Sequence, residues 1–481
     1  MSRLRLQRMA LPVATALLLS LATPGAAHKH HSILDEDEAN KPVDSILWIH
    51  IFLQIIVWGF LFPIGMVLGM ARSKWHVPLQ SCGFVFTLGG YILGHSHGGR
   101  SFLAGAHGVM ANILFAPIFL QLGLGIYLKL HIHEETIRPW AVRAHGVLGK
   151  AYPILGWLQM LFGVIAFRGY CRGGALGQCL AHYIMGSGFI AYGIIMAIML
   201  LVGENWIRRS KRSPEWWDSW VIMLWGIVNT FTEHHGGDWS VKDMQHTVMG
   251  VIWWAGGILG IILARNNQVS ILAITYAAFS THVTMSLKRT VVPALIVIIT
   301  GWAFSNHAQA LMISTNVHAM VGYTLMMAGV TRIIEVCFIA PKYTPLPETA
   351  VADDNRSEHT LTDNTSNASA WQTSKAFRHL PPFLLTASGV LFMSATDEEL
   401  RFVDGEGMDH VTYILLMFSI AFLIYSLVVS LIRIWARLSE NASSSTGDGS
   451  IELSTASKWY APVPGTDAEA EAARHVIGED D

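Results

Sequence analysis

Residues 46–70 read ILWIHIFLQIIVWGFLFPIGMVLGM, a stretch without a single Asp, Glu, Lys or Arg. A helix needs about 20 apolar residues to cross the hydrocarbon core of a bilayer, so this stretch predicts a transmembrane helix. Further stretches of the same kind lie at 77–95, 104–128, 144–167, 180–203, 216–232, 244–264, 290–305, 316–340, 378–396 and 411–435. Because a helix satisfies its own backbone hydrogen bonds in lipid, we expect an all-α, polytopic transmembrane helical protein of about eleven spans.

The composition of the 481 residues leads to the same class. Hydrophobic residues make up 52% and charged residues 14%, whereas a soluble domain carries about 25% charged residues. The formal net charge of −2 provides no basic field for nucleic acid. Four cysteines are too few for a disulfide framework in a chain of this length. We therefore expect membrane lipid as a partner, and no nucleic acid.

Residues 1–27 have the form of a secretory signal peptide. Arg3, Arg5 and Arg8 precede an apolar core, and small residues follow it up to Ala27. The alternative is an uncleaved first span, for which the apolar core is short. After cleavage, residues 28–45 would form a lumenal N-terminal segment.

The distribution of Lys and Arg predicts the orientation. Loops expected inside carry clusters such as Arg208, Arg209, Lys211 and Arg212, and loops expected outside carry one or two basic residues each. This places the N-terminus in the lumen or outside and the C-terminus in the cytosol. We expect a multi-pass protein of the secretory pathway, in the endoplasmic reticulum, the vacuole or the plasma membrane. Cys171 and Cys179 share an outside loop, as a disulfide or as free thiols.

Three polar or ambiguous segments complete the topology. Residues 344–376 and 441–481 are polar and aperiodic, which predicts a disordered inside loop and a disordered cytosolic tail. Residues 269–288 are apolar and about long enough to span. If they did, every later span would invert, and Arg433 and Arg437 would face the lumen. We therefore expect a non-spanning or re-entrant piece.

Four histidines lie on the first four expected spans. His50 and His107 fall in the outer leaflet, and His76 and His145 fall in the inner leaflet. One histidine pair in each leaflet of a four-helix bundle is the arrangement that holds two haems, each with two axial imidazoles. Nearby small residues and possible outer-shell partners are Gly83, Gly108, Gly146, Gly149, Gln80, Gln121 and Gln159. The alternative is that each histidine is an interfacial residue with a structural hydrogen bond.

The same residues resemble the cytochrome b561 domain. The resemblance is carried by His50-x8-Gly59-x3-Pro63-x-Gly65, His76-x3-Gln80-x2-Gly83, His107-Gly108 with Gln121, and Arg143-x-His145-x3-Gly149. It implies that His50 and His107 ligate one haem b, and His76 and His145 a second. We take residues 46–205 as the b561-like transmembrane domain. Residues 131–135 form a longer joint between the third and fourth helices than is usual in that family.

A second group of candidate ligands lies at the outer face of the later spans. It consists of Glu233, His234, His235, His246, His307 and His318. Imidazole with carboxylate suits Fe, Cu or Zn, and the residue types do not choose among them. The alternative is a polar cap that ties helix ends together.

This later part resembles the fungal Ytp-type integral membrane proteins. The resemblance rests on Glu233-His234-His235-Gly236-Gly237-x-Trp239, Gln245-His246-Thr247, Thr300-Gly301-Trp302-Ala303-x-Ser305-x-His307 and Thr331-Arg332-Ile333-Ile334-Glu335. We take residues 206–440 as the Ytp-type C-terminal transmembrane domain. Against that family pattern residues 269–288 look like an insertion.

These patterns favour a di-haem transmembrane electron carrier or oxidoreductase, ferric, cupric or ascorbate-linked, with an unnamed donor and acceptor. They identify no catalytic residue. One alternative is a metal-binding or metal-transporting membrane protein without a redox role. Another is a non-catalytic membrane scaffold.

Overall fold

The computed structural model describes residues 41–232, 234, 238–265, 289–306, 309, 311–339 and 376–444. The predicted signal peptide lies outside these residues, and so do residues 269–288. Most of the expected lumenal segment, the 344–376 loop and the tail lie outside them as well. The chain divides into two compact units, Met1–Gly177 (unit 1) and Gln178–Asp481 (unit 2).

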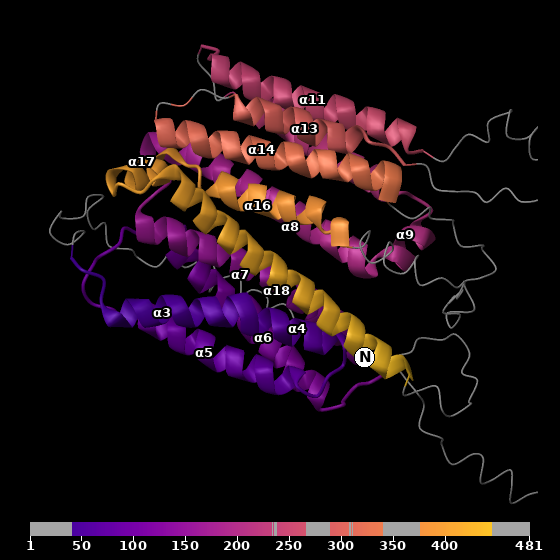
Figure 1. The fold of residues 1–481 in the computed structure, drawn as a ribbon. Coiled ribbons are helices and arrows are strands. Elements are labelled where there is room, and N and C mark those ends of the chain that lie inside the picture. Colours follow the sequence, from indigo (N-terminus) through magenta and orange to yellow (C-terminus); the bar gives the residue numbers. More distant parts are fainter. Residues whose placement is uncertain are drawn as a thin grey trace, which may run out of the picture. The chain divides into compact units, whose positions relative to one another are not determined.

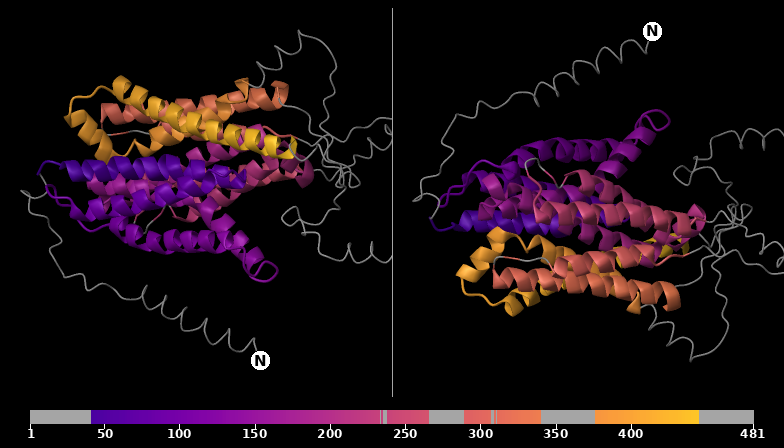
Figure 2. Two further views of the ribbon diagram at one scale, coloured as in Figure 1. Left: turned by 90° about the horizontal axis from the view of Figure 1, so that it is seen from below. Right: turned by 90° about the horizontal axis from the view of Figure 1, so that it is seen from above.

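Unit 1 is a bundle of four long helices (Figure 1). The first helix runs over Ser45–Met70 as α3 (Ser45–Ile56), a π-helical turn (Val57–Leu61) and α4 (Phe62–Met70). The others are α5 (His76–Ser96), α6 (Ala106–Lys129) and α7 (Arg138–Arg168). The views in Figures 1 and 2 agree that α3 and α5 run side by side.

Asp44 fixes the start of the first helix. Its carboxylate accepts hydrogen bonds from the N–H groups of Leu47, at 2.9 Å, and Gly98, at 2.8 Å. The bond from Leu47 lowers the pKa of Asp44 most, with that from Gly98 adding to it. The contact with Gly98 ties the start of α3 to the segment after α5.

The apolar core of unit 1 is one layer halfway along the bundle. It is made of Val57, Trp58, Phe62, Leu114, Ile118 and Tyr152. In the first helix, which includes the π-helical turn and α4, these residues come after His50; on α6 and α7, they come after His107 and His145. The layer therefore divides the bundle into two halves, and each half contains one of the expected histidine pairs.

Unit 2 is also helical. Its helices are α8 (Leu176–Val202), α9 (Glu204–Ser210), α10 (Pro214–Thr232), α11 (Val241–Leu263), α13 (Val292–Ser305), α14 (Met312–Ile334), α16 (Leu380–Met393), α17 (Asp397–Gly405) and α18 (His410–Ser444). The helices α10 and α11 form a hairpin, and α14 packs on α13 and α16.

Close helix packing in unit 2 depends on small residues. An added Cβ at Gly301 would lie 2.6 Å from the carbonyl oxygen of Gly322, so α13 and α14 approach through their glycines. A Cβ at Gly193 would similarly lie 2.6 Å from the carbonyl oxygen of Pro382. Such stripes are the usual means by which membrane helices make close van der Waals contact.

In the sequence, the two units meet near the start of α8. Residues 46–205 are expected to form one b561-like domain, and the part of α8 from Gln178 onwards groups with unit 2. Met185, Phe189, Tyr192 and Met196 of α8 pack against the buried core of unit 2. Hydrophobic length alone predicts that α8 is a helix and gives no sign of which neighbours it packs against.

The expectation of an all-α polytopic membrane protein is confirmed. Within the described residues, eight helices are long and apolar enough to cross a membrane. Val292–Ser305 and Leu380–Met393 are shorter apolar helices, and Pro214–Thr232 carries Glu215 and Asp218 in its first turns. Each of the stretches expected to span is thus helical.

Candidate functional site

The structure brings the four histidines of unit 1 together as two pairs. The ring centroids of His50 on α3 and His107 on α6 lie 6.2 Å apart, with an interplanar angle of 85°. Those of His76 on α5 and His145 on α7 lie 6.1 Å apart, at 90°. Each pair therefore joins one helix of the α3/α5 hairpin to one helix of the α6/α7 hairpin.

These separations match two imidazoles on opposite sides of one metal atom. A ring nitrogen binds a transition metal at about 2.0–2.1 Å, and the nitrogen lies about 1.1 Å from the ring centre. Two rings in line would then have centroids about 6.3 Å apart. The ring-centroid separations of both pairs lie within about 0.2 Å of that value.

Hydrogen bonds fix the tautomers of the two histidines on the α3/α5 hairpin. Nδ1 of His50 lies 2.6 Å from the carbonyl oxygen of Gly90, and Nδ1 of His76 lies 2.7 Å from that of Gly65. A carbonyl oxygen only accepts, so Nδ1 carries the hydrogen in both rings. Nε2 then has its lone pair free for a metal, as in metal-binding histidines that donate Nδ1–H to a carbonyl.

Glutamines hold the two histidines on the α6/α7 hairpin. Nδ1 of His107 lies 3.2 Å from the carbonyl oxygen of Gln159, whose side-chain amide donates to the carbonyl oxygen of His107 at 3.1 Å. The side chain of Gln121 donates to the carbonyl oxygen of His145 at 3.2 Å. Within the described residues, three buried atoms lack a hydrogen-bond partner here: Gln121 Oε1, Gln159 Oε1 and His145 Nδ1.

Each ring packs against a glycine of the neighbouring helix. A Cβ at Gly94 would lie 2.7 Å from the ring of His50, and one at Gly69 would lie 2.7 Å from the ring of His76. A Cβ at Gly163 would lie 3.2 Å from His107. A residue larger than glycine at any of these three positions would therefore press against the histidine ring.

The contacts of the α3/α5 hairpin follow a repeat in its sequence. His50-Ile-Phe-Leu-Gln54 and His76-Val-Pro-Leu-Gln80 share the spacing His-x2-Leu-Gln, and each is followed by Gly-x3-Gly, at residues 65–69 and 90–94. The first copy is one residue longer between its glutamine and its glycines. The π-helical turn Val57–Leu61 absorbs that residue, since a π-bulge is a one-residue insertion in an α-helix and is frequent at functional sites.

A second repeat covers the α6/α7 hairpin. Ala106-His107-Gly108-Val109 is followed after ten residues by Leu120-Gln121, and Ala144-His145-Gly146-Val147 by Leu158-Gln159, with Gly125 and Gly163 four residues beyond each glutamine. The two hairpins therefore have internal two-fold pseudosymmetry in sequence, which relates the two histidine pairs. The pairs differ in one contact: Gln159 Nε2 lies 3.1 Å from Nδ1 of His107, whereas Gln121 Nε2 lies 3.5 Å from Nε2 of His145. Gln54, the counterpart of Gln80, was not expected near the site, because the signal for it is the repeat between the helices and not the sequence of either helix alone.

Only part of the expected outer cluster of unit 2 falls within the described residues. Glu233, His235 and His307 lie outside the described residues. His234 stacks on Trp239, with centroids 4.1 Å apart, and its Nδ1 lies 3.6 Å from the carboxylate of Asp243. Among the described residues, His234, His246 and His318 are not within ligand distance of one another as a group. His318 instead contacts His182, a residue that sequence analysis did not select.

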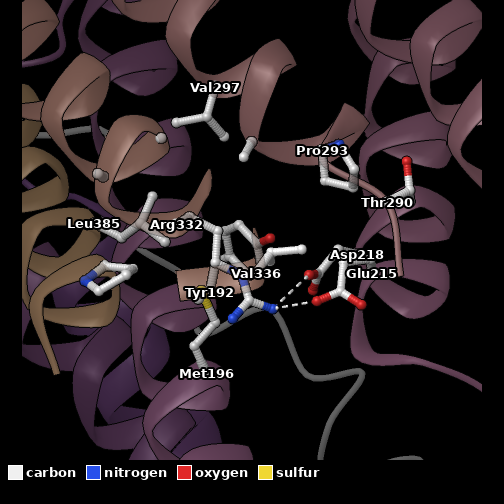
Figure 3. A pocket seen from close by; sticks show the side chains of 14 residues that line it. Tyr192, Met196, Glu215, Asp218, Thr290, Pro293, Val297, Arg332, Val336 and Leu385 are labelled. Carbon is white, nitrogen blue, oxygen red and sulfur yellow. Dashed lines mark hydrogen bonds and ion pairs between the residues drawn. The ribbon is translucent and has the colours of Figure 1, made fainter. Parts of the chain in front are cut away.

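A buried ion network lies at the other end of unit 2, and Figure 3 shows Arg332 of this network beside Glu215 and Asp218. Glu215 accepts from Arg289 at 2.6 Å and from Arg332 at 2.9 Å, and Arg332 also donates to Glu335 at 2.7 Å. Arg378 adds a bond to Glu335 at 3.0 Å. A cavity of about 20 Å³ beside Arg332 has room for one water molecule. Because positive and negative side chains alternate in it, we interpret this network as a structural clamp, which means that it holds segments of unit 2 together.

Comparison with known proteins gives two family matches. The family described as "Protein YTP1-like, C-terminal" matches residues 155–436. A domain of unknown function, DUF2427, matches residues 32–131. No solved structure matches the chain.

Individual relatives are yeast membrane proteins. The chain is 40% identical over 304 residues to Protein YTP1 of Saccharomyces cerevisiae, a match that covers 62% of this chain and 56% of that protein. It is 23% identical over 425 residues to an uncharacterized membrane protein of Schizosaccharomyces pombe, covering 65% of this chain and 83% of that one. An uncharacterized membrane protein of Saccharomyces cerevisiae is 25% identical over 289 residues, 50% of this chain and 40% of its own length.

Proposed function

For a chain that belongs to the YTP1-like family of membrane proteins, we propose that unit 1 binds two haems b and carries electrons across the membrane. His50 and His107 hold one haem, and His76 and His145 hold the other. The supporting observation is the repeated histidine pairing, with ring separations of 6.2 and 6.1 Å that fit one iron.

The ligand set favours haem over a bare metal ion. Within the described residues, none of these four histidines belongs to a group of three or more potential metal ligands. A bare ion would therefore have two protein ligands and lack the further ones that a closed protein site supplies. A haem brings four ring nitrogens of its own and needs only the two axial imidazoles.

Small residues beside the histidines would leave room for a haem macrocycle. Gly108 and Gly146 directly follow His107 and His145, and an added Cβ at either glycine would meet nothing within 4 Å. The side chains of Gln121 and Gln159 hold these two histidines. The Oε1 atom of each glutamine is buried and has no hydrogen-bond partner among the described residues.

The central layer of unit 1 connects the two sites. From His50 to Gly65, which accepts from His76, the helix rises about 22 Å at 1.5 Å per residue. Three aromatic rings lie between these levels, with centroid separations of 4.9 Å for Trp58–Phe62, 5.2 Å for Phe62–Tyr152 and 5.6 Å for Trp58–Tyr152. A bound haem supplies the reversible one-electron chemistry. The chain would supply the four imidazoles that hold the haems and this packed aromatic path between the two sites.

The proposed direction of transfer is from a cytosolic reductant to an acceptor in the lumen or outside. Cys171, which follows α7, is disulfide-bonded, and disulfides persist in oxidising compartments. In unit 1, the end of α7 lies at the same end of the bundle as His50 and His107. That end would face the lumen, in agreement with the basic inside loops.

The test is an absorption spectrum of the purified full-length protein before and after reduction with dithionite. We expect b-type Soret and alpha bands and two haems for each chain. His50→Ala or His107→Ala should remove one haem, and His76→Ala or His145→Ala the other. The absence of reducible b-type bands from folded protein, or full haem content in all four variants, would refute the proposal.

A further inference from the structure

A second cavity of unit 2, of about 240 Å³, adjoins the buried ion network. Charged side chains form one part of its wall: Asp218, Arg289, Arg332, Glu335 and Arg378. A water molecule needs about 10–15 Å³ of such volume. The cavity therefore has room for a group much larger than water.

The guanidinium of Arg289 offers a hydrogen-bond donor to this cavity. Its Nε and Nη2 atoms donate to Oε1 of Glu215, at 3.2 Å and 2.6 Å. Its Nη1 atom is buried and has no hydrogen-bond partner within the described part of the chain. A buried donor without an acceptor is unfavourable, and the charge of an arginine is permanent in proteins. An acceptor bound in the cavity would therefore stabilise this end of the network.

The charges on the wall favour an anion as that acceptor. Three arginines and two carboxylates line the cavity, which leaves one positive charge in excess on its surface. Glu215 accepts from Arg289 and Arg332 but does not line the cavity. The planar guanidinium suits phosphate oxygens in particular, which accept strong charge-assisted hydrogen bonds.

The rest of the wall is apolar and reaches the surface of the protein. Met196, Met199 and Leu200 of α8 line the cavity. Two further lining residues are exposed, Ile195 by 54% and Trp206 by 48%. Because α8 is long and apolar enough to cross a membrane, an exposed isoleucine on it would contact lipid chains. An acyl chain could therefore extend from the cavity along this apolar wall.

The sequence predicts that this end of unit 2 lies at the cytosolic face. Trp206 and Trp217, which both line the cavity, flank the basic segment 208–212 that is expected inside. Tryptophan is enriched at the level of the lipid headgroups. Anionic lipids are concentrated in the cytoplasmic leaflet, and basic pockets between membrane helices on that side bind their headgroups.

We propose that this cavity binds the headgroup of one anionic phospholipid of the cytoplasmic leaflet. The phosphate accepts a hydrogen bond from Nη1 of Arg289, and an acyl chain leaves past Ile195. The site belongs to unit 2 alone, so it stands independently of the haems proposed for unit 1.

The experiment uses full-length protein that has been delipidated in detergent. Native mass spectrometry then counts the phosphatidylserine or phosphatidylcholine that it retains. We expect one phosphatidylserine for each chain, bound more tightly than phosphatidylcholine. Arg289→Gln should weaken its binding by about 10- to 100-fold, the usual effect of losing a hydrogen bond to a charged group.

Arg208→Gln is the matched control, because it removes the same charge at the same end of unit 2. Arg208 pairs with Glu204 at 2.8 Å and does not line the cavity. Equal retention of both lipids by the wild type would overturn the site. So would an equal loss of phosphatidylserine in the two variants, or no loss in Arg289→Gln.

Two measurements on the wild type decide the matter if Arg289→Gln fails to fold. A ligand of the folded state raises the midpoint of thermal unfolding. We expect phosphatidylserine to raise it, and inorganic phosphate, which has the same oxygens without an acyl chain, to leave it unchanged. Phosphatidylserine with a photoreactive acyl chain should label Met196, Met199 or Leu200. A rise with inorganic phosphate alone, or the same labelling by photoreactive phosphatidylcholine, would refute the proposal.

Discussion

Glu215 Oε1 lies 2.6 Å from Nη2 of Arg289, although 74 residues separate them in the sequence. Glu215 begins α10, whose hairpin partner α11 ends nearby: an added Cβ at Gly260 would contact Ser219 and would lie 3.6 Å from Val292. The chain therefore leaves α11 and enters α13 at the same end of unit 2. This is the relationship expected if residues 269–288 do not cross the membrane.

The same pair yields the first prediction, on stability. The side chain of Glu215 is 2% exposed, and removing one partner of a buried ion pair costs about 3–5 kcal/mol because it leaves uncompensated charge. We expect Glu215→Gln to reduce the free energy of unfolding by an amount of this order, and to lower the midpoint of thermal unfolding in detergent.

Glu204→Gln is the matched control for that variant. Glu204 pairs with Arg208 at 2.8 Å, but its side chain is 57% exposed, and exposed pairs contribute about 0–1 kcal/mol. Equal midpoints for the two variants would show that the network of Figure 3 is not a structural clamp.

Much of the fold could be predicted from the sequence, since apolar length alone marks a membrane helix. The alternation of histidines between leaflets also indicated which residues of unit 1 share a level. This alternation was enough to predict the histidine pairs of unit 1, because four helices joined by short loops can pack in few ways.

The arrangement of unit 2 could not be predicted in this way. Residues that are predicted at the same face of the membrane share a depth in the bilayer, but the sequence does not give their positions within the membrane plane. The contact of His318 with His182, 136 residues away in the sequence, was therefore not expected. The cluster with His234 stays a prediction, because Glu233, His235 and His307 lie outside the described residues. The sequence around a single histidine in an apolar helix does not indicate which residue of another helix it contacts.

The second prediction concerns the glycines behind the rings. A Cβ at Gly94 would lie 2.7 Å from the ring of His50, so Gly94→Ala must displace that ring. We expect the variant to lose the haem held by His50 and His107 or to shift its reduction potential, with the other haem unchanged. Gly69→Ala should affect the haem held by His76 and His145 instead. A redox titration followed by absorbance resolves the two.

Gly188→Ala in unit 2 is the control for both glycine variants, because its Cβ would meet nothing within 4 Å. Identical titrations for Gly94→Ala, Gly69→Ala and Gly188→Ala would argue against histidine positioning by these contacts.

The third prediction separates the two sites through their glutamines. Gln159 holds His107, and Gln121 holds His145. Loss of a group that orients a metal ligand typically lowers affinity by about 10- to 100-fold. We therefore expect Gln159→Leu to weaken the haem site of His50 and His107, and Gln121→Leu to weaken the other. Haem retention during dialysis against apomyoglobin measures this. Loss of the same haem in both variants would contradict the pseudosymmetric assignment.

The last prediction tests the topology of unit 2. The start of α11 and the start of α14 lie at the same end of this unit, and Val241 is 68% and Met312 82% exposed there. Val241 is a better position for labelling than Ser240, whose side chain caps α11 by accepting from the N–H of Asp243 at 3.1 Å.

In a background with the free cysteines Cys82 and Cys337 replaced by Ser, we expect Val241→Cys and Met312→Cys to react with an impermeant maleimide from the same side of sealed vesicles. Arg209→Cys, at the opposite end of the unit, should react only after permeabilisation when the first two react without it. Labelling of positions 241 and 312 from opposite sides would mean that residues 269–288 cross the membrane. It would also contradict the contact between His182 and His318.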